Sequence, residues 1–131
     1  MSLPRAAHLS TAPVPGSCVF SSPQHGAEIQ FRGVVREMEK GRKLRGIHYS
    51  AYAPMAERLL RDMLHTVSTA HPHALLFVHH VTGFVPAGKA SLLIAAATPH
   101  SAEAFELVHE ILRWIKRELP VWKEFVYEED V

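Results

Sequence analysis

The segment spanning residues 101–119 most constrains the fold, because it has the pattern of an amphipathic helix and is followed directly by Pro120. Proline has no amide hydrogen and disfavours helical geometry in the residue before it, so the helix must end at Leu119. A helix with one apolar stripe needs a second layer to cover that stripe. The stripe consists of Ala104, Leu107, Val108, Ile111, Leu112 and Ile115.

The remaining periodicities predict one more helix and several strands. Residues 54–70 carry a second stripe at the 3.6-residue spacing, with Pro54 in the first turn. Residues 27–35 and 44–51 alternate, and we expect them to pair as a hairpin across the charged turn 39–43. Apolar runs at 74–82 and 90–98 indicate central strands, and one more strand follows Pro120. The order of elements predicts an α+β domain with two main helices on a mostly antiparallel sheet.

The first 25 residues differ from the remainder in composition. They contain Pro4, Pro13, Pro15 and Pro23, so we expect an irregular lead-in with one short strand at residues 18–20. Residues 26–131 then form a single domain. A chain of 131 residues that is 47% hydrophobic can build one modest core, and dimerisation would bury more surface.

Composition excludes several classes of protein. A net charge of +1, from 14 basic and 13 acidic residues, argues against binding to nucleic acid or to a membrane surface. The single cysteine, Cys18, cannot form an internal disulfide, which favours a reducing cytosol. We also find no signal peptide and no apolar run long enough to span a bilayer. The sequence therefore predicts a soluble cytoplasmic protein.

Lys116 and Lys123 lie on either side of the helix stop at Pro120. The turn imposed by the proline can bring two ammonium groups to one cleft. Closely spaced ammonium groups, or buried ones, become usable nucleophiles or proton donors near neutral pH. The alternative is two solvated surface lysines, which is the usual situation for this residue type.

Two further positions suit an anion. Thr98-Pro99-His100-Ser101 joins a strand to a helix, where free amides and the helix dipole can receive a phosphate beside His100. The alternative is an ordinary N-cap in which Ser101 or Thr98 accepts an amide hydrogen bond. Arg36 ends the first long strand and can grip a phosphate or carboxylate, or it can belong to a solvated basic hairpin.

The ten histidines raise the question of a metal site. The nearest pairs are His79-His80 and His71-Pro72-His73, and neighbours on a strand point to opposite faces. No His-Glu-x-x-His motif or thiolate completes a ligand set, so we predict no metal. Gly-x-Ser-x-Gly, phosphate-loop and dinucleotide glycine motifs are also absent.

Taken in order, several short segments resemble the catalytic (large) subunit family of molybdopterin synthase. The segments are Gly26-Ala27, Phe31-Arg32-Gly33-Val34-Val35-Arg36, Tyr49-Ser50-Ala51-Tyr52 with Met55-Ala56, His100 with Ala104-Phe105, and Lys116 before Pro120-Val121-Trp122-Lys123. The resemblance covers residues 26 to about 125. It implies an α/β-hammerhead-like α+β fold and a sulfurtransferase of molybdenum cofactor biosynthesis. Such an enzyme converts cyclic pyranopterin monophosphate (precursor Z) into the molybdopterin dithiolene.

The resemblance also implies which residues act. Lys116 and Lys123 are the catalytic pair, Lys116 orienting a thiocarboxylate and protonating a departing oxygen, and Lys123 holding the intermediate between two sulfur additions. No cofactor and no metal is implied. The implied substrate-binding residues are Arg36, His100, Ser101, Val34, Val35, Glu124 and Phe125.

The implied partner is a small ubiquitin-like sulfur carrier whose C-terminal Gly-Gly ends as a thiocarboxylate. The family forms a homodimer with a carrier docked at each end, a heterotetramer, and the carrier tail threads into the pocket. Residues 122–127 are a candidate lining for the tail, or they face the core instead. No nucleic acid and no membrane is implied.

The chain departs from the family pattern at three positions. Ser101 stands where an arginine follows the helix-start histidine, Val81 where an arginine follows His80, and Phe125 where a glutamate is usual, with Glu124 one position early. The chain also stops at Val131, where family members commonly continue with a tail that brings a cation to the neighbouring subunit. An alternative function is therefore a degenerate relative that binds the carrier or a pterin phosphate without turnover.

Overall fold

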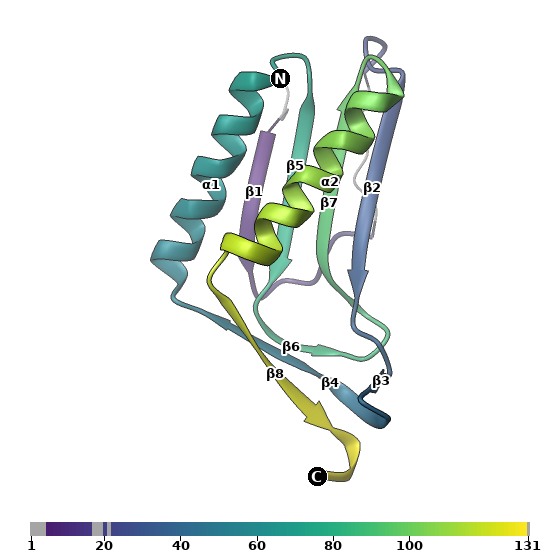
Figure 1. Ribbon diagram of the computed structural model, residues 1–131, viewed down its shortest axis with the longest axis vertical. Helices are drawn as coiled ribbons and strands as arrows, with labels where there is room; N and C mark the ends of the chain where they lie inside the picture. The colour runs from purple at the N-terminus through teal and green to yellow at the C-terminus, as the bar shows by residue number, and fades with distance from the viewer. Residues whose placement is uncertain (1–4, 17–19, 21, 131) are drawn as a thin grey trace.

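A computed structural model describes residues 5–16, 20 and 22–130. It contains two sheets and two long helices (Figure 1). No helix in the described ranges is long and apolar enough to cross a membrane. The predicted α+β class with two helices on a mostly antiparallel sheet is confirmed.

The larger sheet has four strands in the order β1-β5-β7-β2. Its strands are β1 (Arg5–Ser10), β5 (Leu75–Val81), β7 (Ala90–Thr98) and β2 (Ala27–Val34). β5 and β7 are central, as their apolar sequences predict, and each is antiparallel to its neighbour within the β5-β7-β2 part. Only the β1–β5 pair is parallel among the described strands of this sheet.

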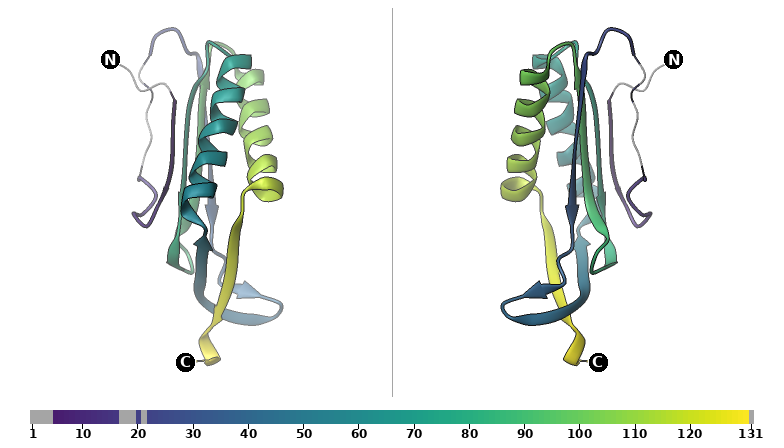
Figure 2. Two further views of the ribbon diagram at one scale, coloured as in Figure 1. Left: turned by 90° about the vertical axis from the view of Figure 1, so that its left-hand side faces the viewer. Right: turned by 90° about the vertical axis from the view of Figure 1, so that its right-hand side faces the viewer.

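Both helices cover the same face of this sheet, as the side views in Figure 2 show. α1 (Ala53–Ala70) packs on β1, and α2 (Ser101–Glu118) packs on β7 and β2. The predicted stripes are inward: Leu60 and Leu107 are at most 1% exposed and meet Leu76 and Ile94 of the sheet in one core. Burial of these aliphatic side chains is what fixes the helices to the sheet.

The smaller sheet lies at the end of the molecule where α2 finishes (Figure 1). It contains β3 (Met38–Glu39), β4 (Arg42–Ala51), β6 (Gly83–Pro86) and β8 (Val121–Tyr127), followed by the short helix η1 (Glu128–Asp130). β4 pairs antiparallel with β3, β6 and β8. A second core, which includes Ile47 and Tyr49, fills the junction between the two sheets.

The predicted hairpin between residues 27–35 and 44–51 is wrong. β2 pairs with β7, and β4 pairs in the other sheet. The inward residues Ile29 and Phe31 of β2 belong to the core under the helices, whereas Ile47 of β4 belongs to the second core. The two strands therefore separate because each buries its apolar face against a different layer.

The N-terminal segment also differs from the prediction. Residues 5–10 form β1, an integral strand of the larger sheet that aligns Ala7 with Val78. Parallel pairing with a strand so distant in sequence has no local turn signal, so periodicity could not reveal it. Of the short strand expected at residues 18–20, residues 18 and 19 lie outside the described residues, and Phe20 is not in a strand.

Candidate functional site

A pocket of about 710 Å³ lies where α2 and β8 meet the ends of β2 and β5, at the junction of the two sheets. That volume suits a small organic ligand, because ligand pockets typically measure about 300–1,000 Å³. Six of the predicted site residues line it together. They are Val34, Val35, Arg36, Lys116, Lys123 and Phe125.

The link between α2 and β8 explains how two lysines reach one pocket. α2 ends at Glu118, and Leu119 adopts an extended conformation (φ −76°, ψ 122°) before Pro120. Leu119 is 8% exposed, so its side chain anchors this link in the core. β8 starts at Val121, and Lys123 then follows as its third residue. The helix therefore presents Lys116 and the strand presents Lys123 to a shared space, and both side chains are solvent-accessible.

Side chains of β8 alternate between the face that lines the pocket and the opposite face. Val121, Lys123 and Phe125 line the pocket, whereas Glu124 is exposed and does not. Successive side chains of a strand point to opposite faces. The structure therefore places Phe125, and not Glu124, in the wall of the pocket.

Arg36 follows β2 and is fixed by a nearby carboxylate. Its Nη2 donates to Oε1 of Glu39 at 3.3 Å, and both residues line the pocket. The Arg36 side chain is 80% exposed, so it can exchange this partner for a ligand anion. The charged side chains around the pocket are Arg32, Arg36, Lys116 and Lys123, together with Glu39.

A buried polar cluster from four strands lies at the pocket. Tyr49 Oη donates to Ser91 Oγ at 3.1 Å, and Ser91 Oγ donates to the carbonyl oxygen of Gly33 at 3.4 Å. The ring of His80 meets the ring of Tyr49 edge-on, with centroids 5.4 Å apart. Burial raises the pKa of the Tyr49 hydroxyl, and the hydrogen bond to Ser91 partly opposes that shift, so Tyr49 stays neutral.

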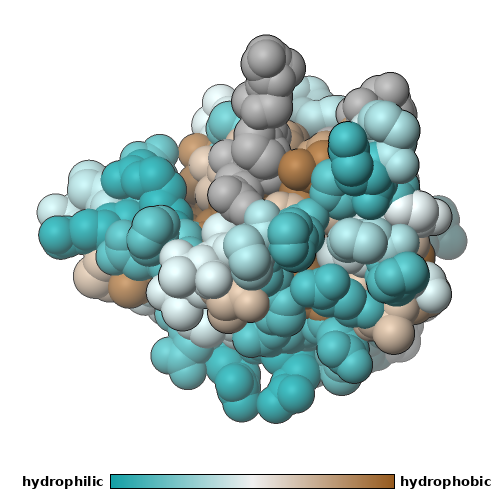
Figure 3. All heavy atoms as spheres, turned by 90° about the horizontal axis from the view of Figure 1, so that it is seen from above, coloured by the Kyte–Doolittle hydropathy of each residue, from teal (hydrophilic) through white to brown (hydrophobic). Residues whose placement is uncertain are grey.

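His100 and Ser101 lie at the opposite end of the molecule. His100 is the N-cap of α2, whereas Lys116 is in its last turn. This end is mainly hydrophilic when seen from above (Figure 3), and both residues are exposed. The His100 side chain makes no capping hydrogen bond, and the Thr98 hydroxyl donates to the His100 carbonyl oxygen at 2.6 Å. The structure therefore does not bring His100 and Ser101 to the pocket of their own chain.

Sequence reasoning did not name Glu39, His80 or Ser91 as site residues. Glu39 belongs to a charged turn that looked solvated, and Ser91 is a small residue inside an apolar strand. The alternation of β5 could have identified His80, because Leu76 and Val78 face the helices and His80 follows at the same spacing. The pocket forms where the two sheets meet, and hydrophobic periodicity in the sequence does not predict which strands of different sheets come together.

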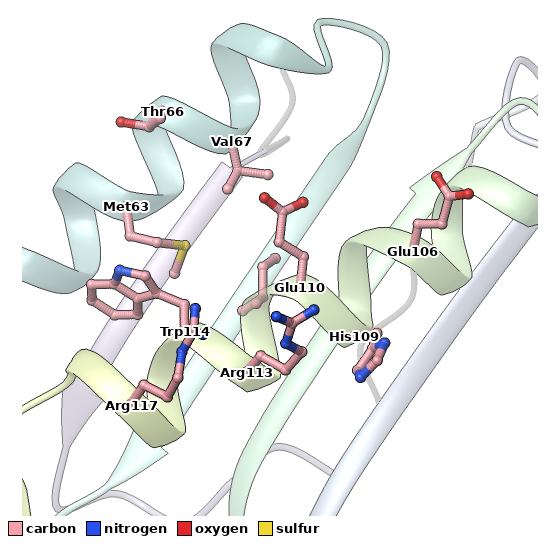
Figure 4. Close-up of a pocket in the computed structure, with 10 residues that line it drawn as sticks. Met63, Thr66, Val67, Glu106, His109, Glu110, Arg113, Trp114 and Arg117 are labelled. Carbon is pink, nitrogen blue, oxygen red and sulfur yellow. The ribbon is translucent and has the colours of Figure 1, made fainter.

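A second hollow lies between the two helices, and none of the predicted site residues lines it. Figure 4 shows Met63 of α1 beside Trp114 of α2, with Glu110 and Arg113 nearby. Its basic residues are interleaved with Glu106 and Glu110. The mixture of charges gives no preference for an anion, so the pocket at the sheet junction is the candidate site.

Within residues 5–16, 20 and 22–130, no group of three histidine, cysteine, aspartate or glutamate side chains could hold a metal ion. Two of the described histidines have other hydrogen-bond partners. His71 Nδ1 lies 2.7 Å from Glu103 Oε2 and joins the end of α1 to the start of α2. His79 Nε2 lies 3.0 Å from the carbonyl oxygen of Ala12, on the face of the sheet away from the helices.

The fold and the pocket define an α+β protein with a cationic pocket between two sheets, suited to a small anionic ligand. Residues 8–118 match the family model described as "MoaE protein". The chain therefore belongs to the MoaE protein family. The match starts before residue 26, where the sequence resemblance begins, and it includes part of β1.

Named relatives and solved structures agree with the family. The chain is 38% identical over 104 residues to "Molybdopterin synthase catalytic subunit" of Oryza sativa subsp. indica, covering 79% of this chain and 54% of that relative. It therefore spans about half the length of the curated relative. Molybdopterin synthase from Staphylococcus aureus superposes with a TM-score of 0.81 at 26% identity, covering 98% of this chain and 94% of that chain.

A second solved structure shares the fold. It is the "Protein-protein complex of subunit 1 and 2 of Molybdopterin-converting factor" from Helicobacter pylori 26695, with a TM-score of 0.66 and 21% identity. The alignment covers 82% of this chain and 74% of that chain.

Proposed function

We propose that this chain is the catalytic subunit of a molybdopterin synthase. It would transfer sulfur from a thiocarboxylated ubiquitin-like carrier to cyclic pyranopterin monophosphate, in the cytosol, and build the dithiolene of molybdopterin. The observation that carries the proposal is the shared pocket of Lys116, Lys123 and Arg36 in a chain of the MoaE family.

The charge of the pocket fits two anionic reactants. A cyclic phosphate and a thiocarboxylate repel each other when they share one site, and fixed cations offset that repulsion. The pocket has Arg32, Arg36, Lys116 and Lys123 against the single carboxylate of Glu39. Arg32 Nη2 already donates to the carbonyl oxygen of Pro15 at 2.9 Å, so the other three are the better candidates for ligand contact.

The two lysines have different roles in this proposal. Lys116, in the last turn of α2, orients the thiocarboxylate and donates a proton to the departing oxygen. Lys123, on β8, holds the pterin intermediate between the two sulfur additions. Arg36 holds the phosphate after exchanging Glu39 for it, while Val34, Val35 and Phe125 form the apolar part of the wall.

His100 enters the proposal only through a second copy of the chain. It lies at the start of α2, far from the pocket at the other end of that helix. A homodimer that brings the start of α2 from one copy to the pocket of the other would allow His100 and Ser101 to contact the phosphate. Ser101 contributes a hydroxyl and the helix amides there, without a side-chain charge.

The proposed partner is a small carrier protein that ends in Gly-Gly as a thiocarboxylate. The Helicobacter pylori structure is a complex of two subunits, and the same fold in this chain supports an equivalent partner. With a homodimer at the centre, a carrier at each end makes a heterotetramer. The carrier tail would have to be extended to reach the pocket, which Phe125 and Lys116 both line.

The second candidate function is binding of the carrier or of a pterin phosphate without turnover. It is favoured by the absence of the family arginines at Ser101 and Val81 and of the family glutamate at Phe125. Phe125 lies in the pocket, so the loss of a carboxylate there concerns the site itself. Glu39 provides one carboxylate in the same pocket, which supports the enzyme over the binding protein.

Reconstitution separates the two functions. The purified chain is mixed with thiocarboxylated carrier and cyclic pyranopterin monophosphate, and dithiolene formation is measured. We expect turnover by the wild type, loss of turnover in Lys116→Ala, and full turnover in Lys43→Ala. Lys43 is a control outside the pocket, 54% exposed, with Nζ 4.0 Å from Glu128 Oε2. Binding of both reactants without any product would establish the binding function instead.

A further inference from the structure

His80 is a buried histidine that faces the proposed reaction. It lies on β5 with only 6% of its surface exposed and lines the pocket that contains both lysines. Its neighbour His79 is equally buried at 6%, but its Nε2 contacts the carbonyl oxygen of Ala12. Adjacent residues of a strand point to opposite faces of the sheet. The two histidines are therefore equally buried but lie on opposite faces.

The hydrogen bond of His80 fixes which ring nitrogen carries a proton. Nδ1 lies 2.9 Å from the carbonyl oxygen of Val81. A carbonyl oxygen can only accept, so Nδ1 must carry the hydrogen in the neutral ring and Nε2 keeps a free lone pair. Across the residues that the structure describes, Nε2 has no hydrogen-bond partner. Nε2 of His80 is therefore a hydrogen-bond acceptor with no donor among the described residues.

The surroundings keep His80 neutral. Burial lowers its pKa, the hydrogen bond to Val81 opposes this, and the positive charge of Lys123 and the nearby His79 lower it further. Tyr49 of β4 meets the ring edge-on and is itself neutral, and Lys116 of α2 lines the same pocket. The pocket also holds Arg32 and Arg36 and the single carboxylate of Glu39, so cations outnumber anions around His80 and protonation of the ring is disfavoured.

The proposed sulfur transfer contains a step that needs such a group. When the thiocarboxylate sulfur bonds to the pterin carbon, a carbon–oxygen bond of the pterin breaks, and the departing oxygen takes a proton from Lys116. The carrier is then attached to the pterin through a thioester. Water must cleave this thioester: the water oxygen bonds to the acyl carbon, and the carbon–sulfur bond breaks. The sulfur stays on the pterin as a thiolate and the carrier leaves as a carboxylate. Two protons are released, and the first must leave the water as it attacks.

We propose that His80 Nε2 accepts that proton and is the general base for release of the carrier. Lys123, and Lys116 after it has regained a proton from solvent, stabilise the oxyanion that forms on the acyl carbon. The imidazolium then returns its proton to solvent through the open pocket, and the second proton is lost from the new carboxylic acid. This inference rests on the proposed function, because the thioester exists only if the chain transfers sulfur.

His80→Asn is the variant that tests the proposal most directly. An asparagine amide can still donate to the carbonyl oxygen of Val81, but it has no group in place of Nε2. His79→Asn is the matched control on the opposite face, with the same substitution at the same burial. In single-turnover reactions with thiocarboxylated carrier and cyclic pyranopterin monophosphate, mass spectrometry follows the covalent carrier–pterin adduct.

We expect His80→Asn to form the adduct at the wild-type rate and to release the carrier slower by about 10²-fold or more. The acid limb of the pH–rate profile for release should disappear, and added imidazole should restore part of the rate. His79→Asn should release the carrier as the wild type does. A purely structural role of His80 predicts no adduct accumulation and no rescue by imidazole.

Release by His80→Asn at the wild-type rate and with the wild-type pH profile would overturn the proposal. If His80→Asn does not fold, His80→Gln is measured in the same way, since glutamine also lacks a basic nitrogen. Failure of the underlying function has a different signature. In that case the wild type itself forms neither adduct nor dithiolene, whatever residue stands at position 80.

Discussion

Lys116 of α2 and Lys123 of β8 line one pocket although a helix end and a proline separate them. The extended conformation of Leu119 and its burial set the direction in which the chain leaves the helix. The amide of Val121 donates to the carbonyl oxygen of Leu119 at 2.8 Å, which tightens the same turn. Rigid supports on both sides of the turn keep the two ammonium groups at the same site.

Conservative replacement of Lys116 should separate the effect of its charge from its role in proton transfer. We expect Lys116→Arg to keep substrate affinity, because its charge remains, and to lower kcat by about 10²-fold or more, because a guanidinium is a poor proton donor. Lys116→Ala should lose affinity as well. Steady-state kinetics of dithiolene formation measure both quantities, and Lys43→Ala is the control. Equal kcat values for Lys116→Arg and the wild type would remove the proton-donor role.

Removing the carboxylate of Glu39 should strengthen binding of the anionic substrate. Glu39 accepts a hydrogen bond from Arg36, and a phosphate must displace it. We expect Glu39→Gln to lower the Kd for cyclic pyranopterin monophosphate by about two- to fivefold, equivalent to about 0.4–1 kcal/mol. Titration calorimetry measures this Kd. Because the Arg36 side chain is 80% exposed, the stability of the fold should change little.

Glu129→Gln is a matched control for Glu39→Gln. Glu129 is likewise a carboxylate paired with an arginine, Arg42, but it is more exposed than Glu39 and lies outside the pocket. We expect no change in Kd for this variant. A weaker affinity in Glu39→Gln would instead show that Glu39 positions Arg36 for the phosphate, and that the ion pair assists binding.

Local patterns in the sequence were sufficient for most elements of the fold. The stripes at 54–70 and 101–119 coincide with α1 and α2 within a residue, because a helix that covers a sheet needs apolar residues at 3.6-residue spacing. β2, β4, β5, β7 and β8 were also predicted. Three strands, β1, β3 and β6, were not predicted. The pairing of β2 was also wrong, because it pairs with β7 and not with β4.

Some of the residues that line the pocket were predicted from the sequence as candidates. Lys116, Lys123 and Arg36 lie near the ends of elements that the sequence predicts. Pro120 stops the helix, and the alternation of β2 ends near Arg36. Glu39, His80 and Ser91 line the pocket only because two sheets meet there. No local sequence pattern predicts the contact between the two sheets. No local pattern predicts the distance of His100 from the pocket either, because His100 lies at the start of α2.

Gly46 should be required for the sheet that presents Lys123. It lies on β4 between Pro86 of β6 and Val126 of β8. An added Cβ would overlap the carbonyl oxygen of Val85 and lie 2.6 Å from the ring of Phe84. We expect Gly46→Ala to lower the free energy of unfolding by about 1–3 kcal/mol, because the backbone of β6 must move. Urea denaturation measures the change.

Gly16→Ala is the control for that substitution, because no atom of the described residues lies within 4 Å of a Cβ added at Gly16. We expect a change within about 0.5 kcal/mol there. Equal stability of Gly46→Ala and the wild type would mean that β4 and β6 are not in contact at this position.

Acidification should destabilise the fold through His80. Its pKa in the folded state is lowered below the ordinary 6.5, chiefly by burial and also by Lys123 and His79, against the hydrogen bond to Val81. Between the folded pKa and 6.5 the unfolded state therefore binds more protons than the folded state. Stability then rises with pH in that window and is lost as pH falls from 6.5 through the folded pKa.

Replacing His80 by asparagine removes this titration and leaves all other ionisable groups in place. We expect the urea midpoint of the wild type to fall more steeply than that of His80→Asn as pH is lowered from about 7.5 to about 5. Above 6.5 the two midpoints should run parallel, since the imidazole is then neutral in both states. Parallel midpoints across the whole range would show that His80 is readily protonated in the folded protein. A protonated ring cannot accept a proton at Nε2, so the same result would also count against its role as a base in the pocket.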